Sequence, residues 1–261
     1  MKEEKYTSAL GAGLGLVDET IALLDIWTPD INSVELYDKA LDSGRFPAIS
    51  ARRLKNIIKE CFSPRYLCNN AQPARIIKPL TKQASQAELL QLMFLFTARA
   101  NPILYDFMRV CYWPAYASGK DVLTNEEAYH FVDDAVSNGN TTTNWSLKVK
   151  RNVAGYLTGC CADYGLLERG RKQKRKIQHY SPSFQTSLVL TYDLHFSGMG
   201  DNAVMSNLDW ELFGLQSMDV RDELKRLSLK GFLIMQTAGD ITHIGWKYKT
   251  WEELLHVITK G

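Results

Sequence analysis

Residues 145–180 constrain the fold more than any other part of this 261-residue chain. The first half of the segment has the apolar period of an amphipathic helix, and the second half has two short apolar stretches around a basic turn. Nine of its 36 residues are Lys or Arg, opposed only by Asp163 and Glu168, although the whole chain carries a formal charge of +2. A helix followed by a basic hairpin predicts a winged helix-turn-helix, and the concentrated charge indicates nucleic acid as a partner.

The phase of the helix supports this interpretation over an ordinary solvent-exposed charge run. At 100° per residue, the apolar face consists of Val149, Val153, Tyr156, Leu157, Cys160 and Tyr164. The opposite face consists of Lys148, Arg151, Asn152, Gly155 and Gly159. Lys and Arg reach phosphates, Arg and Asn also bind base edges, and small residues let a backbone approach a partner closely. Lys150 lies off this stripe and is expected at the edge of the core.

The wing is expected to begin directly after the helix, which should end near Tyr164 with Gly165 as its C′ residue. Leu166-Leu167 would start the first wing strand, 169–172 would form the turn, and 174–180 would return. Unpaired charges are costly to bury, so the tip must face solvent or phosphate. The predicted wing contacts to DNA are Arg169, Arg171, Lys172, Lys174, Arg175 and Lys176.

A second basic helix is predicted near the N-terminus, where Ser50 can cap residues 51–62. Its buried stripe would be Leu54, Ile57, Ile58, Cys61 and Phe62. Its outward side would carry the candidate DNA-binding residues Arg52, Arg53, Lys55, Asn56 and Lys59. Three helices ending in a basic one resemble another helix-turn-helix. A plain charged surface explains the same pattern, and both interpretations stay open.

Most of the remaining chain also has helical periodicity, so the fold class is mainly α, with helix-turn-helix or winged-helix modules and short β-hairpin wings. Further helices are expected over 14–27, 33–41, 85–100, 103–116, 124–136, 218–230 and from Thr250 onward. Ser33 and Thr250 are the expected caps of their helices, and Thr124 with Glu127 is expected to form a capping box. An apolar hairpin over 232–237 and 241–248 indicates a packing or protein-interaction module. The expected domains are 1–82, 83–123 with the central core helices, 124–182 with the basic wing, and 183–261.

The sequence argues against several classes of function. Five cysteines without a CxxC pair, and scattered histidines, predict neither a disulfide framework nor a metal site. The glycines at 11, 13 and 15 have the wrong spacing for a dinucleotide loop, and a flexible helix start is expected there. No motif indicates an enzyme, a cofactor or a small-molecule substrate. The most apolar run, 89–96, predicts a buried helix rather than a membrane span, and no signal peptide is evident, so a soluble cytoplasmic protein is expected.

Three stretches resemble the BrxA family of bacterial BREX phage-defence systems: YTSALGAGLGLVDETIALL, FPAISARRLKNIIKECFSPRYL and WSLKVKRNVAGYLTGCCADYGLLE. The resemblance covers roughly residues 6–182 and is weaker beyond them. It implies a mostly helical, non-enzymatic DNA-binding component that acts beside the BREX methyltransferase, ATPase and phosphatase-like proteins. The predicted function is therefore that of an accessory protein that binds double-stranded DNA. The alternatives are a scaffold that binds other BREX proteins through its basic faces, or an RNA-binding helical protein.

Overall fold

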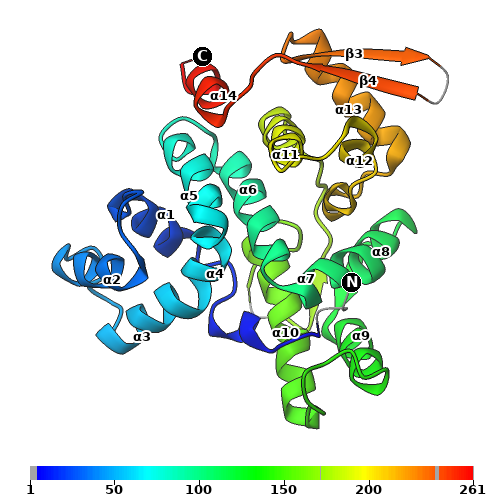
Figure 1. Ribbon diagram of the computed structural model, residues 1–261. Helices are drawn as coiled ribbons and strands as arrows, with labels where there is room; N and C mark the ends of the chain where they lie inside the picture. Colours follow the sequence, from blue (N-terminus) through cyan, green and yellow to red (C-terminus); the bar gives the residue numbers. More distant parts are fainter. Residues whose placement is uncertain (1–4, 171, 239–240, 261) are drawn as a thin grey trace.

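Helices dominate the computed structural model, which describes residues 5–170, 172–238 and 241–260 (Figure 1). The strands of these residues form two antiparallel pairs, β1 with β2 and β3 with β4. The prediction of a mainly α fold is confirmed. No described helix is both long and apolar enough to cross a membrane.

The N-terminal third is a series of short helices on the left of Figure 1. Its elements are η1 (Ala9–Ala12), α1 (Val17–Ile26), α2 (Ser33–Asp42), α3 (Ala51–Asn56), η2 (Ile57–Phe62), α4 (Ser63–Tyr66) and α5 (Cys68–Leu80). The Ser50 hydroxyl accepts a hydrogen bond from the Arg53 backbone N–H at 3.3 Å, as its predicted capping role requires. Asn32 rather than Ser33 caps α2, because the side-chain oxygen of Asn32 accepts from two backbone N–H groups.

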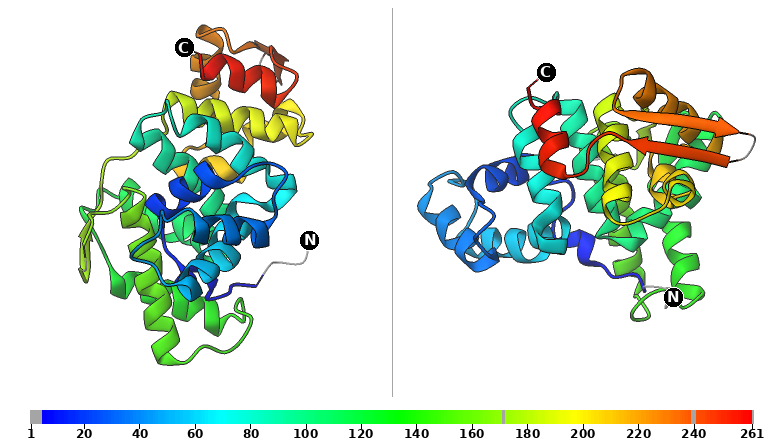
Figure 2. Two further views of the ribbon diagram at one scale, coloured as in Figure 1. Left: turned by 90° about the vertical axis from the view of Figure 1, so that its left-hand side faces the viewer. Right: turned by 45° about the horizontal axis from the view of Figure 1, so that its top comes forward.

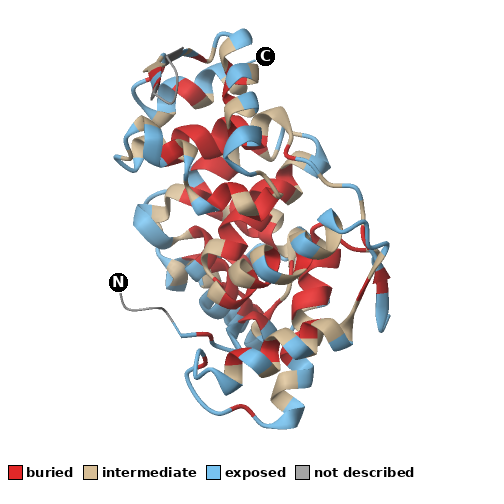
Figure 3. Ribbon diagram, turned by 90° about the vertical axis from the view of Figure 1, so that its right-hand side faces the viewer, coloured by how far each residue is buried: buried red, intermediate tan, exposed pale blue. Residues whose placement is uncertain are grey.

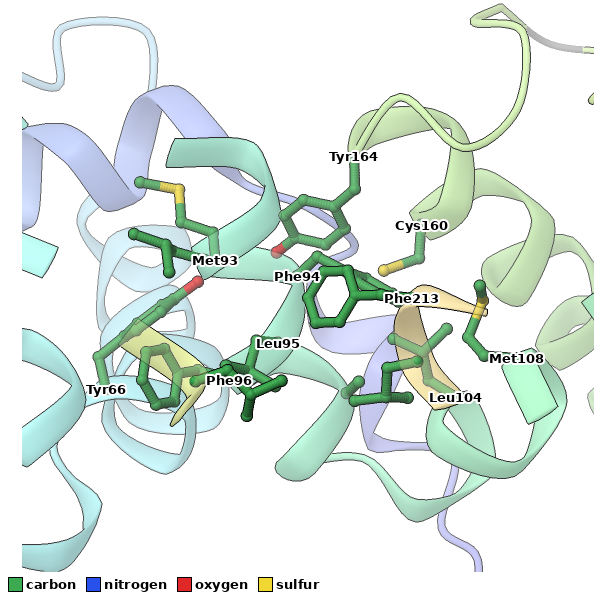
Figure 4. Packing of buried hydrophobic residues seen from close by; sticks show 14 of the residues in the cluster. Tyr66, Met93, Phe94, Leu95, Phe96, Leu104, Met108, Cys160, Tyr164 and Phe213 are labelled. Carbon is green, nitrogen blue, oxygen red and sulfur yellow. The ribbon is translucent and has the colours of Figure 1, made fainter. Parts of the chain in front are cut away.

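The central helices form the middle of the core. They are α6 (Gln86–Arg99), α7 (Pro102–Phe107), η3 (Met108–Tyr112) and α8 (Trp113–Ala117). The apolar run in α6 is buried as predicted, with Phe94 fully covered. Its ring centroid lies 5.8 Å from that of Tyr164 and 5.9 Å from that of Phe213 (Figure 4). One aromatic side chain thus joins the central helices to the two segments that follow.

The segment with the predicted wing contains β1 (Val122–Thr124), α9 (Asn125–Ser137), α10 (Leu147–Asp163) and β2 (Lys174–Lys176). Thr124 and Glu127 form the predicted capping box at the start of α9. The strand pairing differs from the prediction, because β2 pairs with β1 in the register Val122↔Lys176. Leu167 contributes only an isolated bridge, to Ile177. The extended residues before α9 therefore supply most of the partner strand.

The C-terminal elements are α11 (Phe184–Phe196), α12 (Asp201–Met205), η4 (Leu208–Phe213), α13 (Ser217–Leu229), β3 (Leu233–Ala238), β4 (Ile241–Trp246) and α14 (Trp251–Ile258). The predicted helix α13, hairpin and Thr250-capped helix are present. Part of the hairpin turn predicted at 238–240 lies outside the described residues. Helix α11 was not among the predicted helices, because it is buried almost all round and lacks a polar face.

The buried hydrophobic side chains form one continuous cluster from Tyr6 to Leu254. Figure 3 shows this buried interior running along the length of the molecule, with exposed residues along its edges. Residues from all four expected domains contribute to the cluster, so the elements share one interior. The left view in Figure 2 shows α10 at the opposite end of the molecule from α14, with the β1–β2 pair along one side.

Candidate nucleic-acid interface

The exposed basic face predicted for α10 is present at the start of that helix. The Ser146 hydroxyl caps the helix by accepting from the backbone N–H of Val149 at 3.4 Å. Lys148, Arg151 and Asn152 are exposed, and the next residue, at 153, is buried in the core. A short amphipathic period therefore fixes which three side chains face outward.

Lys150 lies at the edge of the core, as predicted. Its ammonium group forms an ion pair with the Asp133 carboxylate of α9 and lies 5.8 Å from the centroid of the Tyr129 ring. The hydrogen bond from Lys150 to Asp133 raises the pKa of the ammonium group. Lys150 is thus committed to holding α9 against α10.

The prediction that small residues leave one face of α10 open to a partner is correct at Gly155 and wrong at Gly159. A Cβ atom added to Gly155 would meet no atom within 4 Å. A Cβ atom added to Gly159 would lie 2.8 Å from Leu14 Cδ1, and Gly159 is buried. The exposed face therefore ends about two turns after the helix begins.

Residues 9–16, which we call the strap, cover the second half of α10. A Cβ atom on Gly11 would lie 2.4 Å from the Tyr156 ring, and one on Gly15 would lie 2.5 Å from Asp163 Cβ. The Gly15 backbone N–H donates to the Asp163 carboxylate at 2.9 Å. The glycines are needed for close approach to α10. The expected flexible helix start is wrong, because these residues form a 3₁₀ turn and a tightly packed segment.

The wing strand β2 presents alternate side chains to opposite faces, as a strand must. Lys174 and Lys176 are exposed, whereas Arg175 is only 8% exposed. The Arg175 guanidinium donates to the backbone carbonyl of Glu168 at 3.0 Å. The prediction that Arg175 is an exposed wing contact is therefore wrong, because it lies on the inner face of the strand.

The turn cations differ in how freely they can meet a ligand. Lys172 is exposed and forms a 2.5 Å ion pair with Glu168, and this hydrogen bond holds the pKa of the carboxyl below its usual value. Arg169 is exposed and donates to the Asp163 backbone carbonyl at 3.3 Å. Arg171 lies outside the described residues. Lys174 and Lys176 form no ion pair with any described residue.

The wing and the exposed face of α10 meet at the start of α9. A hollow of about 350 Å³ is lined by Asn125, Glu126, Tyr129, Arg151, Ala154 and Gln173. The Asn125 backbone N–H donates to the Gln173 carbonyl at 2.9 Å, which fixes the wing strand against the helix start. Arg151 and Gln173 therefore border one surface. Sequence periodicity did not predict that Asn125 and Gln173 belong to it, because the pairing joins residues about 50 positions apart.

The second set of predicted contacts lies on α3 and η2. The exposed members are Arg52, Arg53, Lys55, Asn56 and Lys59. Several have internal partners: the Arg53 guanidinium donates to the Ala12 carbonyl, the Lys55 ammonium lies 5.8 Å from the Tyr37 ring, and Lys59 pairs with Glu60 at 3.5 Å. This surface adjoins the strap, so the two predicted basic surfaces lie on either side of one N-terminal segment.

Comparison with known proteins identifies the family. A family model, BrxA, matches residues 4–192, well over half of the chain. This chain belongs to the BrxA family. Membership makes it a component of a BREX phage-defence system, as the resemblance in the sequence implied.

Two further comparisons concern the fold and the curated relatives of this BrxA-family chain. The fold is similar to the crystal structure of an uncharacterized protein from Magnetospirillum magneticum, with a TM-score of 0.56 and 10% sequence identity. The match covers 78% of this chain and 98% of that chain. At this level of identity the similarity concerns the fold alone. No curated protein shows significant sequence similarity to the chain.

Proposed function

We propose that this BrxA-family protein binds duplex DNA through the exposed face of α10 and the outer face of β2. The observation that carries the proposal is the junction at the start of α9, where Arg151 and Gln173 line one hollow. Cations on either side of this junction can contact one duplex together. The order β1–α9–α10–β2 supports a winged-helix mode of binding, in which a helix enters the groove and the wing contacts the backbone.

The roles of the side chains follow from their positions. Arg151 and Asn152 project from the first turns of α10, where Arg can bind guanine and Asn can bind adenine in the major groove. Lys148, Lys174 and Lys176 supply positive charge for phosphates. The open space at Gly155 allows the helix backbone to come close to the duplex. We assign binding rather than catalysis to this surface.

The shape of the surface favours DNA over duplex RNA. An α-helix fits the B-form major groove, which is about 12 Å wide, whereas the A-form major groove is too deep and narrow for a helix. Because α10 carries the Arg and Asn side chains on a regular helix, it suits the wider groove.

Fluorescence anisotropy with a labelled DNA duplex tests the proposal. Replacing Arg151, Lys174 and Lys176 together by Gln should weaken binding by roughly a hundredfold or more at low salt, since a phosphate that is no longer neutralised also keeps its counterions. The matched control replaces Lys82, Lys230 and Lys260, which are also exposed, by Gln. Equal affinity of the two triple variants would refute the assignment, and preference for an RNA duplex would replace it with the RNA alternative.

A protein-binding role for the C-terminal module is the second candidate. Leu229 on α13 and Ile234 on β3 are 87% and 62% exposed, and these two elements pack against each other, so both side chains are candidates for a protein contact. Replacing both by Ser should leave DNA affinity unchanged and weaken association with another BREX protein in a pull-down with purified components. If the α10 and wing variants disrupt that association but not DNA binding, the scaffold function replaces the first proposal.

A further inference from the structure

A groove that shares no lining residue with α10 or the wing separates α5 from α11 and α14. It consists of two adjoining hollows of about 580 Å³ and 860 Å³, and Gln72, Phe196 and Trp251 line both. We call it the α5–α14 groove. Figure 1 shows α14, which lines this groove, beside the upper end of α5. Each hollow has a size typical of pockets that take a small molecule or one unit of a polymer.

The smaller hollow has an excess of positive charge. It is lined by Arg75, Lys78 and Lys249, with Glu252 as the one acid among its described lining residues. Lys78 is committed, because its ammonium group donates to three backbone carbonyls at the end of α1. The Arg75 Nε–H donates to the Asn70 carbonyl at 3.1 Å, and its two terminal nitrogens have no hydrogen-bond partner among the described residues. Two exposed cations, Arg75 and Lys249, therefore point to an anionic group.

The larger hollow has cations that are already bonded. Arg99 pairs with Asp193 at 2.5 Å and with Asp209 at 2.7 Å. Arg65 is buried and donates to the backbone carbonyls of the strap. An anion entering the groove is therefore favoured at the Arg75–Lys249 end and not at this end.

Aromatic rings form the wall between the two hollows. Trp251 contacts Phe196 with 5.2 Å between ring centroids and 66° between ring planes. Trp251 is partly exposed, so part of the indole is open to a partner. Aromatic faces beside exposed cations are the usual means of binding an unpaired nucleotide, whose base stacks while its phosphate is held.

A strained turn contributes two residues to the lining of the larger hollow. Asn69, Asn70 and Ala71 all have left-handed backbone angles, with φ of 49°, 56° and 56°. Consecutive residues with side chains rarely adopt this conformation, and such strain persists where the surrounding structure fixes it, often at binding sites. Here the turn places the Asn70 carbonyl where it accepts from Arg75, and it places Asn69 and Asn70 among the residues that line the groove. Asn amides can bind base edges as donor and acceptor together.

We propose that the α5–α14 groove binds a nucleotide, with the phosphate at Arg75 and Lys249, the base on Trp251 and the base edge toward Asn69 and Asn70. A free nucleotide and the unpaired 5′ end of a DNA strand present this same chemistry. The site is independent of the proposed duplex-binding surface, since the two share no residue.

Isothermal titration calorimetry of the full-length protein tests the proposal. The probes are deoxyadenosine and thymidine monophosphates, and a four-nucleotide thymidine oligomer with and without a 5′ phosphate. We expect saturable binding that requires the phosphate. If the monophosphates bind as tightly as the oligomer, the site is assigned to free nucleotides. Arg75→Gln with Lys249→Gln should weaken binding roughly tenfold or more, because the double substitution removes two charge-assisted hydrogen bonds to the phosphate. Trp251→Leu should weaken binding of all bases alike.

The control variant, Lys82→Gln with Lys230→Gln, changes two exposed cations outside the groove and should bind as wild type. Duplex-DNA affinity is measured for every variant, so that failure at this groove is distinguished from failure at α10 and the wing. Absence of saturable binding by every probe overturns the proposal. Equal weakening of nucleotide binding by the control pair also overturns it. Displacement of the nucleotide by poly-glutamate at equal charge concentration overturns it as well, and would assign the groove to an acidic protein segment.

Discussion

Replacing Lys174 and Lys176 by Ala tests the wing most directly, because the residue between them provides an internal control. Both ammonium groups are exposed and form no ion pair with a described residue. If each neutralises one phosphate, their removal reduces the log–log dependence of affinity on salt by about 1.8. Between about 50 and about 200 mM salt, wild type should then lose about twelvefold more affinity than the variant.

Arg175→Ala should give the opposite pattern. Its side chain is buried, and removing it breaks the hydrogen bond to the Glu168 carbonyl and leaves a gap beneath the strand. A charge-assisted hydrogen bond is worth about 1.5–3 kcal/mol, so the melting temperature should fall by several degrees. The salt dependence of the folded variant should match that of wild type.

The assay is fluorescence anisotropy with one labelled duplex over a series of salt concentrations, combined with thermal unfolding of each variant. If Arg175→Ala changes the salt dependence and the double Lys variant does not, the inward and outward assignments along β2 are wrong. If neither variant changes the salt dependence, the wing does not contact phosphates, and the proposed duplex interface is reduced to the exposed face of α10.

Three further predictions concern stability. Gly15→Ala should destabilise the protein by about 1–3 kcal/mol, because the new methyl group overlaps Asp163 Cβ. Gly155→Ala should stabilise it by about 0.5–1 kcal/mol, because the new methyl group meets no atom and alanine favours the helix. Urea unfolding measures both changes in the free energy of unfolding, and equal effects would contradict the packing of the strap. Burial lowers the pKa of His195, so the folded state binds fewer protons than the unfolded state, and the free energy of unfolding should fall as pH drops from about 7.5 to about 5.5. His195→Gln should flatten that dependence, and an unchanged slope would exclude His195 as its source. Ala71→Gly should raise the melting temperature, since relief of the left-handed strain, about 1–2 kcal/mol, exceeds the entropic cost of glycine, and a lower melting temperature would show that the turn is not strained.

Sequence periodicity predicted the features that depend on neighbours along one helix. The outward positions of Arg151 and Asn152 followed from the apolar period of α10, and the caps at Thr124 and Thr250 followed from local side-chain chemistry. These features need no knowledge of the tertiary fold. The helix-turn-helix and winged-helix description remains a prediction, and so do the domain boundaries.

Features set by distant segments were not predictable in the same way. Gly159 was predicted to lie on an open face because its neighbour, Leu14, lies 145 positions earlier in the chain. Arg175 lies in a uniformly basic run, so hydropathy gave no sign of which cation turns inward, and only the register with β1 decides it. Helix α11 lacks an amphipathic pattern because nearly every side is buried, and β1 is only three residues long.

The strap links the two basic surfaces physically. It lies along the second half of α10 through Gly11 and Gly15, and the guanidinium groups of Arg53 and Arg65 bind its backbone carbonyls. Because the strap occupies the second half of the helix, the proposed duplex interface is restricted to the first turns of α10. The proposal therefore assigns direct base contacts to Arg151 and Asn152. The same contacts fix the basic face of α3 relative to α10. A change in the strap therefore alters both surfaces together, whereas a substitution in the wing alters only one.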